Sequence, residues 1–261
     1  MRALSIGATG MQAQQLNVEV ISNNIANIST TGFKRSRAEF QDMLYENLRR
    51  VGSPTSDNGT LLPSGLQVGL GVRPVATYRI NEQGNVSVTD NEYDVAVNGR
   101  GFFQIDLPDG TTAYTRAGSF QLDEDGQLVT PDGYPLSPAI TIPANALSVS
   151  ISTAGEVTAE IDGATAMQSL GSIELASFIN PAGLVAIGDN FLTETAASGS
   201  PTTGAPASAG FGTVIQGSVE VSNVDVVTEI TNLITAQRAY EMNSRVIKAA
   251  DEMLSTVSQL R

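Results

Sequence analysis

The chain has 261 residues, enough for one large domain or two smaller ones, and its 27 acidic and 14 basic side chains give a formal net charge of -13 at pH 7. It contains no cysteine and no histidine, which excludes Cys–His and Ser–His nucleophiles and the usual structural zinc sites. The acidic balance, without a basic stripe that carries interleaved aromatic residues, excludes nucleic acid as an expected partner.

The N-terminal segment is predicted to be a helix with a coiled-coil-like seam. Its larger apolar residues recur every seven positions, with a second column three residues further on: Leu4, Met11, Val18, Ile25, then Ile21 and Ile28. Gly7, Gly10 and Gln14 lie near the start of this seam, and glycine is a poor helix former, so we expect the first turns to be weak. No apolar run is long enough for a secretory signal or a spanning helix, so we expect neither a cleaved signal peptide nor membrane insertion.

Asparagine is enriched toward the end of this predicted helix, at Asn17, Asn23, Asn24 and Asn27. Asn23 and Asn27 are four residues apart, a spacing that places two side chains on one helical face. Their amide groups can donate and accept hydrogen bonds. We therefore expect these asparagines to bind a neighbouring helix and to fix the register of packing.

A long loop is predicted next. Residues 51–65 carry Gly52, Pro54, Gly59, Pro63 and Gly65, and no apolar pattern interrupts them. Loops of this length are uncommon in compact domains and are usually functional or disordered. We expect this one to be functional.

Short strands joined by tight turns are predicted for the middle of the chain. An alternating run at residues 93–97 and an apolar run at residues 102–105 each lead into a turn signal. The turn signals are Asn98-Gly99, Pro108-Asp109-Gly110, Asp125-Gly126 and Asp132-Gly133. This pattern predicts an antiparallel, sandwich-like or barrel-like region. Residues 193–212, rich in small and polar residues, are predicted to be a surface loop or linker.

Two motifs in the middle resemble ligand sites and are better explained as turns. Asn98-Gly99-Arg100-Gly101 lacks the third glycine of a dinucleotide-binding loop and does not open a helix. Asp123-Glu124-Asp125-Gly126 resembles part of a calcium loop, but no bidentate glutamate follows at the required spacing. We expect no catalytic, cofactor-binding or metal-binding residue in the chain.

The C-terminal segment is the stronger of the two predicted helices. No proline or glycine occurs between Asp225 and Leu260, so about 35 residues can form one helix on the order of 50 Å long. Its seven-residue pattern comprises Val226, Leu233, Tyr240, Ile247 and Leu254, then Ala236, Ala250 and Val257, with Glu229 and Asn243 as polar exceptions. Two terminal helices around a β-rich middle predict an α+β fold in which the helices pair as a coiled-coil-like unit. The alternative for the C-terminal segment is an amphipathic helix that packs on a core of its own.

The two ends also resemble a known family. Residues 23–35 and 222–225, together with 236–244, resemble the signature segments that flagellar rod and hook proteins share. Residues 62–74, 101–103 and 109–116 resemble the distal-rod members in particular, and hook proteins are normally much longer. Ser5 departs from the pattern, because relatives often have a large aromatic residue after the first leucine.

The resemblance implies a structural subunit of the flagellar distal rod, without enzymatic activity, that polymerises into a straight, rigid, hollow tube which transmits torque and passes exported subunits. It implies a helical inner domain (1–34 and 222–261), a connecting β region (35–92 and 213–221) and an outer β-rich domain (93–212). Residues 45–63 correspond to the rod-specific stretch, represented by Tyr45, Arg49, Arg50, Pro54 and Pro63. The expected interface residues are Leu4, Met11, Val18, Ile21, Asn23, Asn24, Ile25, Asn27, Ile28, Val226, Leu233, Tyr240, Asn243, Ile247 and Leu254.

The implied partners are copies of the chain itself, proximal-rod proteins, a hook or hook-rod neighbour, the surrounding bushing rings and the flagellar type III export apparatus, with the rod crossing the periplasm. Three alternatives remain at this point. One is a proximal-rod or hook-like member of the same family. The others are a secreted adhesin-like β protein with a coiled-coil stalk and an acidic carbohydrate-active enzyme, which would need a pair of carboxylates in a cleft.

Overall fold

The computed structural model describes residues 2–49, 64–163 and 166–259. The chain divides into two compact units. The helical unit comprises Met1–Ile25, Ser36–Tyr78 and Asp225–Arg261, and the β-rich unit comprises Ala26–Arg35 and Arg79–Val224. Residues 50–63, and with them Arg50, Pro54, Pro63 and most of the predicted long loop, lie outside the described residues.

Both predicted terminal helices are present. α1 spans Arg2–Ala26 and α2 spans Val226–Gln259, the latter without interruption over 34 residues. The Asp225 carboxylate accepts a hydrogen bond from the backbone N–H of Thr228 at 2.7 Å, which satisfies a free amide at the start of α2. The seven-residue pattern therefore predicts the helices themselves well, although α1 ends before Ile28.

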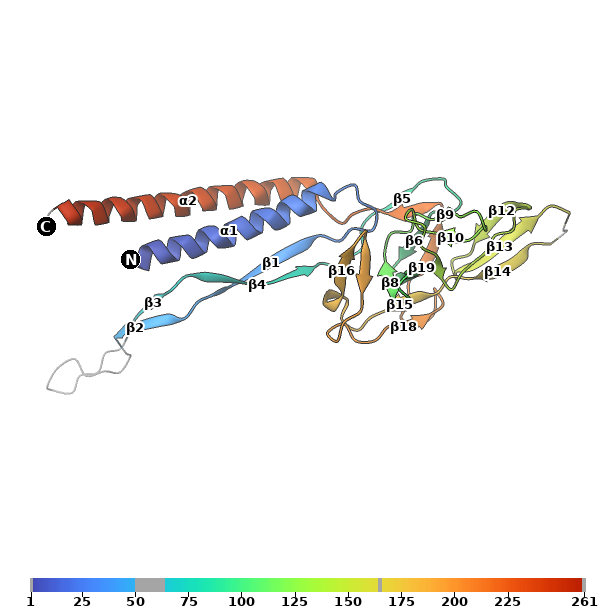
Figure 1. Cartoon of the computed structure of the whole chain (residues 1–261), viewed down its shortest axis with the longest axis horizontal. Coiled ribbons are helices and arrows are strands. Elements are labelled where there is room, and N and C mark those ends of the chain that lie inside the picture. The colour runs from blue at the N-terminus through green and yellow to red at the C-terminus, as the bar shows by residue number, and fades with distance from the viewer. Residues whose placement is uncertain (1, 50–63, 164–165, 260–261) are drawn as a thin grey trace. The chain divides into compact units, whose positions relative to one another are not determined.

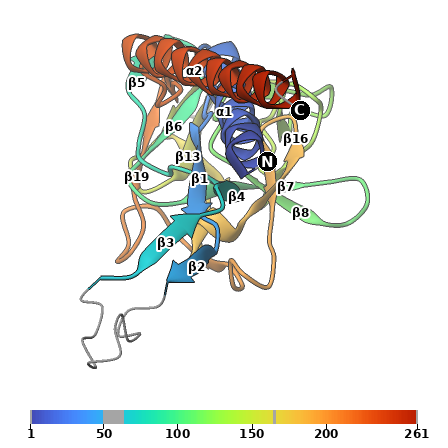
Figure 2. The ribbon, with the colours of Figure 1, turned by 90° about the vertical axis from the view of Figure 1, so that its left-hand side faces the viewer.

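Narrow two-stranded ribbons complete the helical unit (Figure 1). β1 (Ser36–Asp42) pairs with β4 (Val72–Arg79), and β2 (Tyr45–Arg49) pairs with β3 (Leu66–Gly69). Most side chains of these strands are exposed. Figure 2 shows the β2–β3 ribbon below the helices of the same unit in that view.

Short strands form the β-rich unit, and its largest sheet has seven of them in the order β16-β17-β8-β7-β15-β18, with β11 also paired to β7. A three-stranded sheet β12-β13-β14 and the pairs β9–β10, β6–β19 and β5–β20 complete it. The bounds are β5 Val86–Val88, β6 Val95–Asn98, β7 Phe102–Asp106, β8 Thr112–Thr115, β9 Gln121–Leu122, β10 Leu128–Val129, β11 Leu136–Ser137, β12 Ala146–Ile151, β13 Glu156–Ile161, β14 Gln168–Ser172, β15 Leu175–Ser177, the 3₁₀ turn η1 Pro181–Gly183, β16 Val185–Gly188, β17 Phe191–Thr193, β18 Thr202–Gly204, β19 Thr213–Gln216 and β20 Ser218–Glu220.

The hydrophobic core of this unit lies between its sheets. Phe103 and Phe120 meet edge to face at its centre, with ring centroids 5.2 Å apart. Apolar residues of β6, β7, β12, β13 and β15 pack around them. The α+β class with terminal helices and a central antiparallel β-rich region is confirmed.

Two predictions about the middle of the chain are wrong. β6 does not form a hairpin with β7 across Asn98-Gly99 but pairs with the distant strand β19, which occupies that edge. Residues 193–212 are not a linker, because β18 pairs with β15 and Phe211 packs against the core. Here tertiary pairing overrides a local turn signal and a local composition. The hairpins at Pro108-Asp109-Gly110 and Asp125-Gly126 are confirmed.

Candidate assembly interface

α1 and α2 lie side by side within the helical unit (Figures 1 and 2). They approach closely at two glycines: a Cβ atom on Gly7 would lie 2.8 Å from Cγ1 of Ile247, and one on Gly10 would lie 2.8 Å from Nδ2 of Asn243. These glycines therefore have a packing role that outweighs their poor helix propensity. A side chain at Gly7 or Gly10 would have to displace Ile247 or Asn243, whereas the weakness of the first turns stays a prediction.

The residues expected at an interface divide by how far the single chain already covers them. Ile21 and Asn24 are buried. Nine are half-buried: Leu4, Met11, Val18, Ile25, Asn27, Ile28, Leu233, Asn243 and Ile247. Val226, Tyr240 and Leu254 are exposed. One side of the α2 pattern therefore packs within the chain, and part of it stays open.

α2 carries further apolar residues that the seven-residue pattern did not select. Val227, Ile230 and Ile234 lie at helical spacing in its first half. Met242, Val246, Ala249 and Met253 do so in its second half, where Met242 and Met253 are 63% and 61% exposed. These seven residues are called the α2 stripe below. Within each half the residues are three or four apart, and Ile234 and Met242 are eight apart. This spacing was visible in the sequence as a signal for further apolar surface on the helix.

The asparagines near the end of α1 have different environments. The amide of Asn24 accepts a hydrogen bond from the backbone N–H of Ser36 at 2.8 Å and donates one to its carbonyl at 2.9 Å. This mimics a strand pairing and fixes the chain as it enters β1. Asn23 is exposed on α1, whereas Asn27 and Ile28 lie in the turn after the helix, so Asn23 and Asn27 do not share a helical face.

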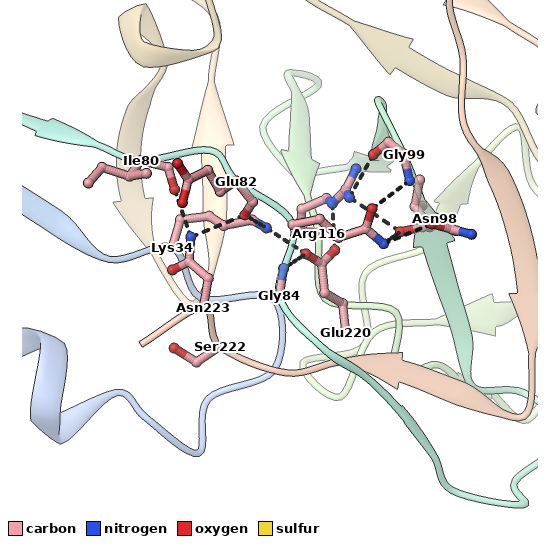
Figure 3. Close-up of polar contacts among 12 residues, drawn as sticks. Lys34, Ile80, Glu82, Gly84, Asn98, Gly99, Arg116, Glu220, Ser222 and Asn223 are labelled. Carbon is pink, nitrogen blue, oxygen red and sulfur yellow. Dashed lines mark hydrogen bonds and ion pairs between the residues drawn. The ribbon is translucent and has the colours of Figure 1, made fainter. Parts of the chain in front are cut away.

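A buried ionic cluster lies in the β-rich unit, at the segment that follows α1 (Figure 3). The Glu220 carboxylate accepts hydrogen bonds from Lys34 Nζ at 2.5 Å, from Arg116 Nε at 2.7 Å and from the backbone N–H of Gly84 at 2.8 Å. The side chain of Glu220 is fully buried, and those of Lys34 and Arg116 are 7% exposed. Burial lowers the pKa of Lys34, and its contact with Glu220 opposes that shift.

Arg116 also ties the cluster to the turn after β6. Its guanidinium donates hydrogen bonds to the backbone carbonyls of Val97, Gly99 and Gly101. Gly32 has a φ of +69°, and a Cβ atom there would lie 2.5 Å from the backbone nitrogen of Ala117. Only glycine fits at this position. The glycine and lysine of the Thr31-Gly32-Phe33-Lys34 segment therefore have a structural explanation inside one chain.

A second polar clamp holds the same segment. The side chain of Asn223 accepts a hydrogen bond from the backbone N–H of Arg35 at 2.7 Å. Its amide donates hydrogen bonds to the carbonyls of Ile80 and Glu82 at 2.9 and 3.1 Å (Figure 3). Sequence reasoning assigned no role to Lys34, Arg116, Glu220 or Asn223 beyond the family signature, because their partners are far away in the chain.

Tyr45 and Arg49, the described residues of the rod-specific set, are exposed on β2. A hydrogen bond to Asp42 and the negative charge of that group raise the pKa of Tyr45. Neighbouring apolar side chains of the ribbons, including Leu44, Leu48 and Leu66, are also exposed. This surface suits packing against another chain better than contact with water.

The described residues offer little for site chemistry of other kinds. No group of three or more carboxylates in that part of the chain is arranged to hold a metal ion. None of the helices that the structure describes combines the length and apolarity needed to cross a membrane.

Three family models match the chain. They are described as "Flagella basal body rod protein" at residues 4–34, "Flagellar hook protein FlgE/F/G D1 domain" at residues 96–159 and "Flagellar basal body rod FlgEFG protein C-terminal" at residues 215–260. The first and last cover α1 and α2, and the second covers much of the β-rich unit.

Curated relatives match over the whole length. The flagellar basal-body rod protein FlgG of Caulobacter vibrioides is 57% identical over 261 residues, which is 100% of both chains. The chain belongs to the flagellar basal-body rod protein family. Two further relatives support this membership. The FlgG protein of Agrobacterium fabrum is 53% identical, with 99% of each chain covered. The FlgG protein of Bacillus subtilis is 38% identical, with 100% of this chain and 99% of the relative covered.

Family membership settles the general function of the chain. It is a structural protein of the flagellar basal-body rod, and this family is not known to include enzymes. The resemblance read from the two ends of the sequence is thereby confirmed. The flagellar basal body is accordingly where a rod protein of this family resides.

Proposed function

We propose that the chain is the subunit of the distal rod and polymerises with copies of itself into a straight, hollow tube. The observation that carries the proposal is the α2 stripe, which one chain leaves uncovered. Burying a valine, isoleucine or methionine side chain contributes about 1.5–3 kcal/mol relative to leaving it in water. Six of the seven stripe residues are of these types, and together they are a strong drive for association once neighbouring copies cover them.

The arrangement of the tube follows from the two faces of α2. The face toward α1 pairs within the chain as a coiled-coil-like unit, and the α2 stripe packs on helices of neighbouring copies. Contacts that join different surfaces of identical subunits need not close, and they generate helical arrays. Asn23, which is exposed on α1, is among the residues that we expect at contacts between copies.

In the proposed rod the middle of the chain lies outermost and its two ends lie innermost. Residues 1–34 and 222–261 form the inner tube, 35–92 and 213–221 the connecting β region, and 93–212 an outward, sandwich-like or barrel-like domain. Residues 45–63 add contacts between subunits that resist axial sliding. The proposed partners are proximal-rod proteins, a hook or hook-rod neighbour and the bushing rings, and export by the flagellar type III apparatus requires no cleaved signal peptide.

Charge on the α2 stripe tests the proposal. Val246→Lys combined with Met253→Lys places two charges where neighbouring helices would bury them, and buried unpaired charge is very unfavourable. Both residues are exposed in the single chain, so the purified subunit should melt within a few degrees of the parent. Cells that carry only this variant should lack distal rods in electron micrographs of basal bodies.

Gln237→Lys is the matched control, because Gln237 is an exposed polar residue of the same helix. It adds charge without replacing an apolar residue of the stripe, and rods should form. Rods of normal length in the Val246→Lys, Met253→Lys variant would contradict the proposed role of the stripe.

A further inference from the structure

The cationic side chains of the β-rich unit are concentrated in one place. The unit is acidic overall, and its cations are Lys34, Arg35, Arg79, Arg100 and Arg116. All but Arg35 line two adjoining cavities of about 190 and 240 Å³. The cavities share part of their lining, including Lys34 and Arg116. An acidic surface that gathers its cations around two hollows has the electrostatic character of a receptor for anions.

Positive charge at these cavities exceeds the negative charge that balances it. Glu220 is the one carboxylate in the described chain that forms an ion pair with Lys34 or Arg116, and it serves both. Arg79 and Arg100 form no ion pair or hydrogen bond through their side chains with any described residue. Burial lowers the pKa of Arg79, which marks a charge that is partly removed from water without compensation. Asp189 lines the first cavity but remains exposed.

An acidic turn of the same unit carries negative charge that no described cation balances. Asp123, Glu124 and Asp125 follow β9, and all three are exposed. None of them forms an ion pair with a described cation. The turn lines neither of the two cationic cavities, so one chain does not bring these groups together.

We propose that the Asp123–Asp125 turn of a second copy of the chain binds at the cavities beside Arg79 and Arg100. This contact rests on the proposed self-assembly and names one of the surfaces that it uses. Guanidinium groups bind carboxylates through paired, charge-assisted hydrogen bonds, which fix orientation as well as adding energy. Turn and cavities are different surfaces of one molecule, so the contact can repeat from copy to copy and need not close.

Disulfide crosslinking tests the contact directly, because the chain contains no cysteine of its own. Arg100→Cys and Glu124→Cys are made in separate chains and assembled together, so a disulfide between them must join two subunits. Oxidised rods should give a covalent dimer on a non-reducing gel. Met167→Cys replaces Arg100→Cys in the control, since Met167 is an exposed residue of the same unit that lines neither cavity.

Rods that form but yield no more dimer than the Met167→Cys control would overturn this contact and leave the proposed self-assembly intact. Failure of the parent chain to polymerise at all would instead contradict the proposed function. The two failures are therefore distinguishable.

Charge reversal provides an independent arm. Arg79→Glu should reduce rod assembly at least about tenfold, and the added Glu124→Arg substitution should restore it, because the pair is then re-formed with opposite sign. Unimpaired assembly of the single variant, or a double variant no better than the single one, would count against the proposal.

Discussion

At the scale of single residues, Glu220 is the residue that holds the ionic cluster of the β-rich unit together. It is fully buried and balances two cations from distant parts of the chain, Lys34 and Arg116. Removing one member of a buried ionic group leaves uncompensated charge, which is far more costly than the group is stabilising. The backbone N–H of Gly84 also donates a hydrogen bond to this carboxylate.

Glu220→Gln should therefore destabilise the β-rich unit by about 3–5 kcal/mol. The substitution keeps the size of the side chain and removes its charge. Urea unfolding of the purified subunit, followed by circular dichroism at a wavelength that reports strands, measures the effect. Glu46→Gln is the control, because the Arg2–Glu46 ion pair is 48% and 43% exposed and such pairs contribute about 0–1 kcal/mol. Equal losses in the two variants would refute the special role of Glu220.

At the scale of elements, the sequence predicts what is local. The periodicity of α2 gives its bounds nearly to the residue, and Pro108-Asp109-Gly110 gives the β7–β8 hairpin. It does not predict that β6 pairs with β19, because nothing near Asn98-Gly99 indicates which distant strand takes that edge. The apolar pattern also continues to Ile28, although α1 ends at Ala26 where Asn24 bonds to Ser36.

The candidate site was predictable to a similar extent. The seam residues could be read from spacing, but which of them face the partner helix depends on how the two ends of the chain meet. Gly7 illustrates the limit: on sequence grounds it is a weak point, and only its proximity to Ile247 makes it a contact. The ionic cluster around Glu220 was not predictable, because its members are joined by tertiary structure alone.

Gly7→Leu tests the close approach of the helices. Leucine is a better helix former than glycine, so propensity alone predicts a gain. The new side chain would overlap Ile247, and overpacking of this kind costs about 1–3 kcal/mol. We expect faster amide hydrogen exchange throughout α1 in the purified subunit. Ala8→Leu, at the next and exposed position, should leave exchange unchanged or slower. Slower exchange in Gly7→Leu would contradict the packing role.

At the scale of the whole molecule, the proposed rod must be stiff as well as assembled, and the two properties have different sources. The α2 stripe supplies association, since apolar burial is strong and non-directional. Non-directional contacts alone allow neighbouring subunits to slide along the axis, which is what bending requires. Directional contacts at a different distance from the rod axis, which we call the second radius, resist that sliding. Our candidate for them is the rod-specific stretch at residues 45–63, of which Tyr45 and Arg49 are exposed.

Deleting residues 51–58 should therefore separate stiffness from assembly. The α2 stripe is untouched, so we expect filaments of this chain still to form. Contacts at the second radius are lost, so the filaments should curve, and their persistence length in electron micrographs should fall well below that of the parent. The Val246→Lys, Met253→Lys variant provides the opposite comparison, in which we expect no filament to form. Filaments as straight and stiff as the parent after the deletion would assign rigidity to the helices alone.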